Sequence, residues 1–253
     1  MSWRTVSASV VGTSHIDNGS GCQDSCIAFV ESVATKPSLL SIFVADGAGS
    51  AACGGEGAEL AIEAAAGFTS NAYINADHEL DEGFAVGCID AVRRRIFAAA
   101  DKAGRPARDY ACTFLALLTT ANFTMAMQIG DGGIVLDTGE GLHVPIVPMS
   151  GEYANMTNFV TDENALDVII TKVYRQAASR VAVFSDGIQR LAMNMATNTP
   201  HEPFFLPFFQ TLAITSSEKD DQLHDALVTF LGSAEVNDRT DDDKTLVIAI
   251  AGS

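Results

Sequence analysis

The sequence predicts an α+β protein in which two antiparallel sheets lie face to face and helices cover them on the outside. Two observations carry this prediction. Segments typical of strands and of helices occur in separate runs along the chain, which favours an α+β architecture over repeated βαβ units. In addition, several predicted strands are apolar at nearly every position, as expected for strands that are buried on both faces.

The first run of the chain is expected to form strands. Residues 3–11 alternate between apolar and polar side chains, and residues 26–33 and 39–45 are rich in apolar and β-branched ones. The break at Lys36-Pro37 between the second and third strands suggests an antiparallel pair. Residues 12–21, rich in Gly, Ser, Asn and Asp, are typical of a loop, and this loop contains His15.

Two helices are expected next. Residues 56–67 are rich in strong helix formers. In residues 80–103, apolar side chains recur at helical spacing, and Gly104 and Pro106 follow as stop signals. A second run of strands is expected after them, with an irregular polar stretch that resembles a lid at 148–164. The expected strands are 111–119, 123–129, 134–137, 142–147 and 167–173.

The last part of the chain is expected to mix strands and helices. Residues 181–184 and 245–251 are apolar runs typical of buried strands, and the second of them would complete a sheet. Helices are expected at 187–196, 208–213 and 220–231, with the proline-containing stretch 200–207 as an interruption. We therefore expect a single domain over 1–253 with a flap-like insertion at about 148–175.

Composition limits the function. The 253 residues are 47% apolar, which fits a globular protein, and the formal charge of −17 argues against nucleic acid as a partner. We find no apolar segment of the roughly 20 residues that span a bilayer and no apolar signal-like start, so a cytoplasmic protein without a membrane partner is expected, as a monomer. The five cysteines include no CxxC pair, which favours neither disulfides nor a zinc site.

Acidic residues follow or precede apolar runs at four places in the chain. Asp-Gly follows a predicted strand at Asp46-Gly47, Asp131-Gly132 and Asp186-Gly187, and residues 241–243 are three aspartates just before the last strand. A carboxylate at a strand end lies on the rim of a sheet, where rigid backbone holds it toward a ligand. Each Asp-Gly alone is also common turn or cap chemistry, but the repetition predicts one acidic site gathered from across the chain.

Such a site suits divalent metal ions. Carboxylates and backbone carbonyls are the ligands of hard ions such as Mg²⁺ and Mn²⁺. Gathered carboxylates repel one another and raise their own pKa values unless a cation neutralises them. Two ions about 3.5–4 Å apart would clamp a phosphate and lower the pKa of a bridging water. The chemistry predicted is phosphoester hydrolysis without a protein nucleophile.

The order of these motifs resembles the metal-dependent type 2C Ser/Thr protein phosphatases, and their compact bacterial branch in particular. The resemblance runs from about residue 12 to 250 and includes a flap-like segment, Gly151-Glu152-Tyr153-Ala154-Asn155. The motifs that carry it are Cys22-Gln23-Asp24, Val44-Ala45-Asp46-Gly47, Ile129-Gly130-Asp131-Gly132, Phe184-Ser185-Asp186-Gly187 and Asp242-Asp243-Lys244-Thr245. It implies a four-layer α/β/β/α sandwich with a binuclear Mn²⁺ or Mg²⁺ centre.

The resemblance also implies roles for individual residues. Asp46 would bridge both metals and the Gly47 carbonyl would bind one, while Asp186 and Asp242 would ligate the other. Asp131 matches the carboxylate for a third, weaker metal, and Asp24 matches a residue that acts through metal-bound water. The bridging water would attack phosphorus, and the phosphoserine or phosphothreonine oxygen would leave. In the acidic tail, Asp242 fits the ligand by its spacing to Thr245, and Asp243 is the alternative.

Three positions depart from the family pattern. Gln23 stands where Glu is usual, Gly19 stands where many members have a phosphate-binding Arg, and Ala48 stands where many have His. These changes affect the positioning of phosphate more than the binding of metal. His15 lies near the Gly19 position, and it would either bind phosphate, donate a proton to the leaving group or have no role.

Three functions follow from this sequence. The first is metal-dependent hydrolysis of phosphoserine and phosphothreonine in phosphorylated protein substrates. The second is a catalytically weak or inactive phosphoprotein-binding module on the same fold, which Gly19 and Ala48 suggest. The third is a small-molecule phosphomonoesterase, because the same metal chemistry acts on small phosphoesters.

Overall fold

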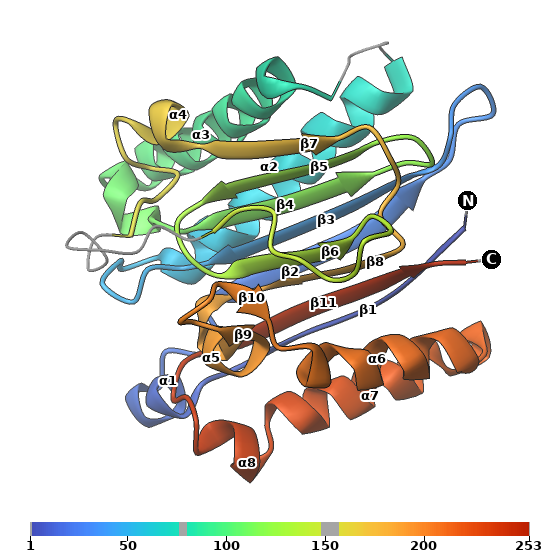
Figure 1. Ribbon diagram of the computed structural model, residues 1–253. Helices are drawn as coiled ribbons and strands as arrows, with labels where there is room; N and C mark the ends of the chain where they lie inside the picture. Colours follow the sequence, from blue (N-terminus) through green and yellow to red (C-terminus); the bar gives the residue numbers. More distant parts are fainter. Residues whose placement is uncertain (1, 76–79, 148–156, 253) are drawn as a thin grey trace.

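Two antiparallel sheets pack face to face in the computed structural model, which describes residues 2–75, 80–147 and 157–252 (Figure 1). One sheet has the strand order β1-β11-β8-β6 and the other has the order β2-β3-β4-β5-β7. The strands of the first sheet are β1 (Trp3–Val10), β11 (Lys244–Ala251), β8 (Arg180–Phe184) and β6 (Gly133–Asp137). Those of the second are β2 (Asp24–Glu31), β3 (Leu39–Asp46), β4 (Phe114–Thr119), β5 (Thr124–Ile129) and β7 (Ile170–Tyr174).

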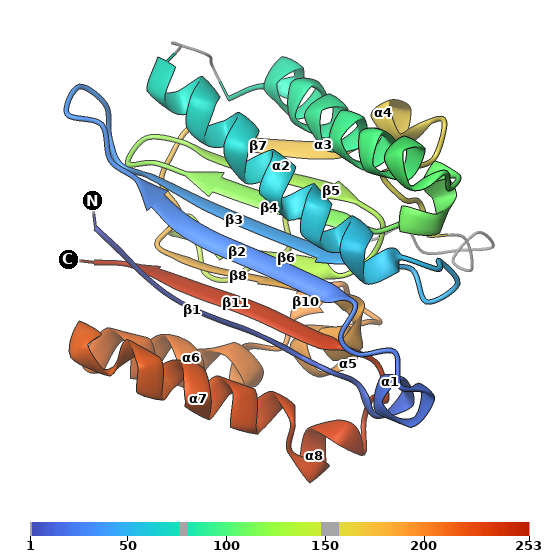
Figure 2. The same ribbon diagram turned by 180° about the vertical axis from the view of Figure 1, so that it is seen from behind.

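Helices cover the outer faces of both sheets. The helices α2 (Gly54–Asn75) and α3 (Glu82–Ala103) lie over the five-stranded sheet, as Figure 2 shows from behind. The helices α6 (Glu202–Ile214) and α7 (Asp220–Leu231) lie over the four-stranded sheet. The predicted α+β class and its α/β/β/α layers are therefore confirmed. The shorter elements are α1 (Thr13–Asn18), η1 (Ala107–Tyr110), α4 (Ala165–Val168), η2 (Asp186–Ile188), α5 (Gln189–Ala192), β9 (Met193–Asn194), β10 (Thr199–Pro200), η3 (Ser217–Lys219) and α8 (Ala234–Asn237).

The four layers explain why the strands are apolar at almost every position. Side chains of a strand point alternately to its two faces, and here both faces meet apolar neighbours. On β3, Leu39 and Phe43 pack toward α2 and α3, whereas Ile42 and Val44 pack between the two sheets. On β11, Ile248 faces the layer of α6 and α7. Three separate apolar layers thus hold the sandwich together.

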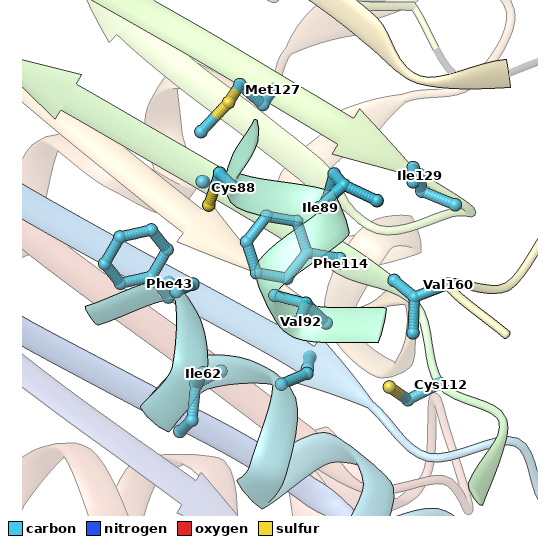
Figure 3. Close-up of a cluster of buried hydrophobic side chains, with 14 of the residues drawn as sticks. Phe43, Ile62, Cys88, Ile89, Val92, Cys112, Phe114, Met127, Ile129 and Val160 are labelled. Carbon is cyan, nitrogen blue, oxygen red and sulfur yellow. The ribbon is translucent and has the colours of Figure 1, made fainter. Parts of the chain in front are cut away.

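The layer under α2 and α3 is the largest of the three. Phe43 of β3 stacks against Phe114 of β4, with 6.0 Å between ring centroids, and both side chains are fully buried. Figure 3 shows this cluster, including Cys88 of α3 and Cys112. Both cysteines are free and buried, and they pack as small apolar residues.

Tertiary contacts make two predicted irregular segments helical. The expected loop 12–21 contains α1, which is held by the hydrogen bond from the Ser14 amide to the Asp241 carbonyl, 2.9 Å. The stretch 200–207 does not interrupt the helix that follows, because residues 202–207 form the first half of α6. Pro203 lies in its first turn, where no amide hydrogen bond is needed. Pro207 removes one bond, and burial of Phe205, Phe209 and Leu212 compensates.

Other boundaries also differ from the sequence prediction. Helix α2 continues eight residues past Gly67, because Phe68 packs its ring 5.3 Å from that of Phe84 and Thr69 is buried. The segment 142–147 forms one isolated bridge, between His143 and Leu136, instead of a strand. The predicted helix 187–196 is divided among η2, α5 and β9, and the strand expected at 167–173 is divided between α4 and β7.

The flap-like segment 151–155 lies outside the described residues, so the flap and the single-domain organisation stay predictions. Beyond it, β7 pairs with β5 and belongs to the five-stranded sheet. In the described part of the chain, the helices are too short or too polar to cross a membrane.

The apolar layer under α2 and α3 gives a first prediction. Replacing Phe43 by Ala leaves a cavity beside Phe114, and we expect the free energy of unfolding to fall by about 3–5 kcal/mol. The matched control is Ile214→Ala at a side chain that is 86% exposed, with an expected change within about 0.5 kcal/mol. Equilibrium unfolding in urea measures both, and equal losses in the two variants would contradict the assignment of the core.

Candidate active site

The acidic residues predicted from the motifs converge at one end of the sandwich. Asp24 begins β2 and Asp46 ends β3, and the antiparallel register pairs these two residues directly. Asp131 lies in the turn between β5 and β6, Asp186 follows β8, and residues 241–243 precede β11. This is the end at which α1 and α5 lie in Figure 1. Residues far apart in the sequence therefore form one acidic cluster, as predicted.

An open pocket of about 320 Å³ lies at this end. Most of the predicted site residues line it together, namely His15, Asp46, Gly47, Asp131, Asp186 and Asp242. Asp241, one of the three aspartates before the last strand, also lines the pocket. Thr157 and Phe159 line it too, and no sequence motif indicated them. Of the described residues in the pocket wall, none is Lys or Arg.

The backbone holds Asp46 firmly at the pocket. The Thr113 amide donates a hydrogen bond to the Asp46 carbonyl at 2.8 Å. The Asp46 amide in turn donates one to the Thr113 hydroxyl oxygen at 3.1 Å. The next residue must be glycine, because a Cβ at Gly47 would lie 2.3 Å from the backbone carbon of Gly54. Asp46 therefore keeps its position without help from a flexible loop.

Asp24 lies beside Asp46 but is buried, with 6% of its surface exposed. Its Oδ2 accepts a hydrogen bond from the Ser185 hydroxyl at 2.7 Å, and that hydroxyl in turn accepts the Thr245 amide at 3.0 Å. Asp24 belongs to one sheet, whereas Ser185 and Thr245 border strands of the other. This buried chain of hydrogen bonds joins the two sheets directly behind the pocket.

Asp242 and Asp243 are placed differently. Asp242 lines the pocket. Asp243 is only 2% exposed, and its carboxylate accepts the backbone amides of Gly12 at 2.6 Å and Gln23 at 2.5 Å. This arrangement supports Asp242 over Asp243 as the residue available to a metal, and the ligand assignment itself stays a prediction.

Burial and mutual repulsion shift the acidity of the cluster. Burial, followed by the charges of Asp243 and Asp186, raises the pKa of Asp24 to about 7. Burial and the charges of Asp131 and Asp242 raise the pKa of Asp186 to about 6. The pKa of Asp46 rises further, by burial and by the charges of Asp24 and Asp186. These carboxylates are costly to ionise in the folded protein unless a cation accompanies them.

The donor set fits divalent metal ions. Three buried acceptor oxygens at this end have no hydrogen-bond partner: Oε1 of Gln23, Oδ1 of Asp24 and Oδ1 of Asp186. A cation or its bound water would satisfy them. Within the described residues, no three His, Cys, Asp or Glu side chains are already arranged to hold an ion by themselves. Magnesium characteristically binds through one or two carboxylates and keeps several waters, which this dispersed set allows.

Several supporting residues carry no signal that the sequence analysis used. The Thr157 hydroxyl donates to Asp131 Oδ2 at 3.0 Å, and Ser185 and Thr113 hold Asp24 and Asp46 as described above. Isolated Ser and Thr residues are too common to indicate such contacts. Ser185 is the exception, because it belongs to the motif Phe184-Ser185-Asp186-Gly187.

The fold and this acidic site define a metal-dependent phosphatase, and the comparisons with known proteins agree. The family profile described as Protein phosphatase 2C matches residues 11–232, a range that includes Asp24, Asp46, Asp131 and Asp186. The chain therefore belongs to the protein phosphatase 2C family.

One relative supports the same assignment, and solved structures at lower identity share the fold. The chain is 49% identical over 250 residues to serine/threonine-protein phosphatase 3 of Escherichia coli (strain K12), covering 99% of both chains. The structure of the S. agalactiae serine/threonine phosphatase aligns with a TM-score of 0.65 at 16% identity, over 99% of this chain and 100% of the other. The catalytic domain of the phosphatase PstP, solved with two manganese ions, aligns at 0.60 with 17% identity, over 98% and 97%.

The acidic cluster predicts how stability depends on pH in the absence of metal. Because the folded-state pKa values of Asp24 and Asp186 are raised, the folded chain retains protons that the unfolded chain has lost. In chelator, stability should therefore fall by several kcal/mol as the pH rises from about 4 to about 7. Adding Mn²⁺ or Mg²⁺ at pH 7.5 should restore it, because a cation replaces the protons.

Thermal unfolding with and without chelator measures this effect. A matched control is Asp225→Asn, at an exposed position on α7, which should leave the pH dependence unchanged. Asp46→Asn should weaken both the pH dependence and the stabilisation by metal. If the metal-free protein were equally stable at pH 5 and pH 7.5, the proposed repulsion within the cluster would be wrong.

Proposed function

We propose that this chain is a Ser/Thr protein phosphatase that removes phosphate from phosphoserine and phosphothreonine in proteins, with divalent metal ions bound at the acidic pocket. One observation carries the proposal. A phosphate group must enter a pocket that is lined by five aspartates and by no Lys or Arg among its described residues. Cations must accompany the phosphate there, because like charges in a partly buried site repel strongly.

Particular residues would hold these ions. Asp46 would bridge two of them, the Gly47 carbonyl would ligate one, and Asp186 and Asp242 would ligate the other. Asp131 would serve a third, weaker site, and Asp24 would act through water. All of these except Asp24 line the pocket, and Asp24 lies beside Asp46. Mn²⁺ and Mg²⁺ are the proposed ions, and the PstP structure with two manganese ions supports a binuclear centre.

When bound, such ions draw charge from the phosphoryl oxygens and lower the pKa of water, so that it attacks at neutral pH. The chain supplies the rigid placement. Asp46 and Asp24 are fixed by strand pairing. Gly47 is held by the hydrogen bond that its amide donates to the Gln23 carbonyl at 3.1 Å. The open pocket leaves room for a phosphorylated side chain presented on the surface of another protein.

The departures at Gly19 and Ala48 concern groups around the phosphate. Gly19 ends α1 in the left-handed conformation, φ 69°, and has no side chain within reach of the pocket. Ala48 lines the pocket without a polar group. The proposed metal ligands Asp46, Asp186 and Asp242 line one pocket, and the relative at 49% identity is named a phosphatase. Both observations favour hydrolysis over a module that only binds phosphoproteins.

The decisive variant is Asp46→Asn. It keeps the shape of the side chain but removes a proposed bridging charge, so metal-dependent turnover should fall at least about a hundredfold. The fold should remain, and in chelator the melting temperature should not drop, because a repelled carboxylate has been replaced by a neutral amide. Phosphate release from a phosphothreonine peptide, with Mn²⁺, with Mg²⁺ and with chelator, measures the activity, and Asp225→Asn is the control.

Two results would change the conclusion. Metal binding without turnover of any phosphopeptide would support the binding module. A preference of several orders of magnitude for small phosphomonoesters over phosphopeptides would support a small-molecule phosphatase. A cytoplasmic location, a monomeric state and the exclusion of nucleic acid and membranes as partners stay predictions from the sequence.

A further inference from the structure

One carboxylate of the acidic cluster is turned away from the pocket and holds a histidine. The carboxylate of Asp243 accepts hydrogen bonds from the backbone amides of Gly12 and Gln23. Its Oδ2 also lies 2.7 Å from Nδ1 of His15. With three donors around it, Asp243 is fully hydrogen-bonded, although only 2% of the residue is exposed. A carboxylate in this position fixes both the orientation of the imidazole and the nitrogen that carries its proton.

His15 connects this buried carboxylate to the pocket. Its side chain is only 15% exposed, and it lines the same pocket as Asp46 and Asp242. Because Nδ1 is engaged by Asp243, Nε2 is the ring nitrogen that is left to act on a substrate. His15 is the only side chain with a nitrogen donor among the described residues that line the pocket.

The segment that carries His15 is held in place by the C-terminal part of the chain. Ser14, the preceding residue, bonds to the Asp241 carbonyl through both its amide at 2.9 Å and its hydroxyl at 2.7 Å. Gly12 approaches so closely that a Cβ there would lie 2.3 Å from the Asp241 carbonyl oxygen. Helix α1 therefore presents His15 from a fixed position, although it is only six residues long.

The proposed reaction needs a proton at this place. When the bond between phosphorus and the serine or threonine oxygen breaks, the electron pair stays on that oxygen, which is a strong base and requires a proton. Ala48 supplies none. We propose that His15 and Asp243 form a proton-donating pair in which Nε2 of His15 protonates the leaving oxygen and Asp243 is its positioning residue.

The proton balance of this step closes. The reaction starts with the His15 ring protonated on both nitrogens, Nδ1 toward Asp243 and Nε2 toward the leaving oxygen. Water adds its oxygen to phosphorus as the ester bond breaks, the leaving oxygen takes the proton from Nε2, and a proton released by the attacking water restores the proton on Nε2. Asp243 stays ionised throughout and stabilises the protonated ring. The products are the free hydroxyl side chain and inorganic phosphate. This inference rests on the proposed phosphatase function.

The test compares two leaving groups. The phosphothreonine peptide has a strongly basic leaving oxygen, whereas p-nitrophenyl phosphate releases a weakly basic one that needs no proton. In His15→Gln we expect kcat on the peptide to fall about 10²–10³-fold with little change in KM, in the range for loss of a general acid. On p-nitrophenyl phosphate, kcat should stay within about threefold. His224→Gln, at an exposed histidine on α7, is the matched control.

A second variant tests the pairing itself. Asp243→Asn should give the same selective loss on the peptide, and the double variant should lose no more than His15→Gln alone, because both changes disable one unit. Nitrogen-15 spectra of the imidazole, recorded in chelator, should show a protonated Nδ1 in the parent protein and a changed tautomer balance in Asp243→Asn. Thermal unfolding checks that both variants fold.

Each contrary outcome has a distinct meaning. Equal losses on both substrates would overturn the proton-donating role and make His15 a phosphate-binding or structural residue. Additive losses in the double variant, or an unchanged imidazole spectrum in Asp243→Asn, would overturn the pairing. A parent protein without metal-dependent turnover of either substrate would instead overturn the proposed function, and this inference with it.

Discussion

The repulsion among buried carboxylates is the constraint on which the rest of this structure depends. Asp24 and Asp46 face each other in the register of one sheet, and Asp186 approaches from the other. Like charges in directly opposed strand positions are destabilising, and burial adds to that cost. Three continuous apolar layers provide the packing that holds these side chains in place.

The site sits on strand ends because they are the stiffest places available. Asp46 is held by backbone bonds to Thr113, and the Ser185 hydroxyl bonds to Asp24 across the junction of the sheets. A charged cluster on long loops would move apart to relieve its repulsion. Here the sheets prevent such relaxation, so that the repulsion is relieved either by protons, which the raised pKa values retain, or by divalent cations.

Two of the three departures from the family pattern, Gly19 and Ala48, lie around the acidic cluster, and the third, Gln23, lies within it. Gln23 replaces a carboxylate in a cluster that already has several, and its amide carries no charge to add to the repulsion. Gly19 and Ala48 remove groups that would contact phosphate. His15 and Asp243, from the two ends of the chain, occupy the same region.

The sequence by itself determined the layered α+β class and the acidic strand ends, because apolar periodicity and Asp-Gly spacing are local properties. It also indicated the choice of Asp242 over Asp243. The features that depend on long-range contacts were decided only by the tertiary structure. It made residues 13–18 helical, carried α6 through Pro207, buried Asp24 behind the pocket and turned Asp243 toward His15. Each of these depends on partners far away in the chain, which no local pattern of residues records.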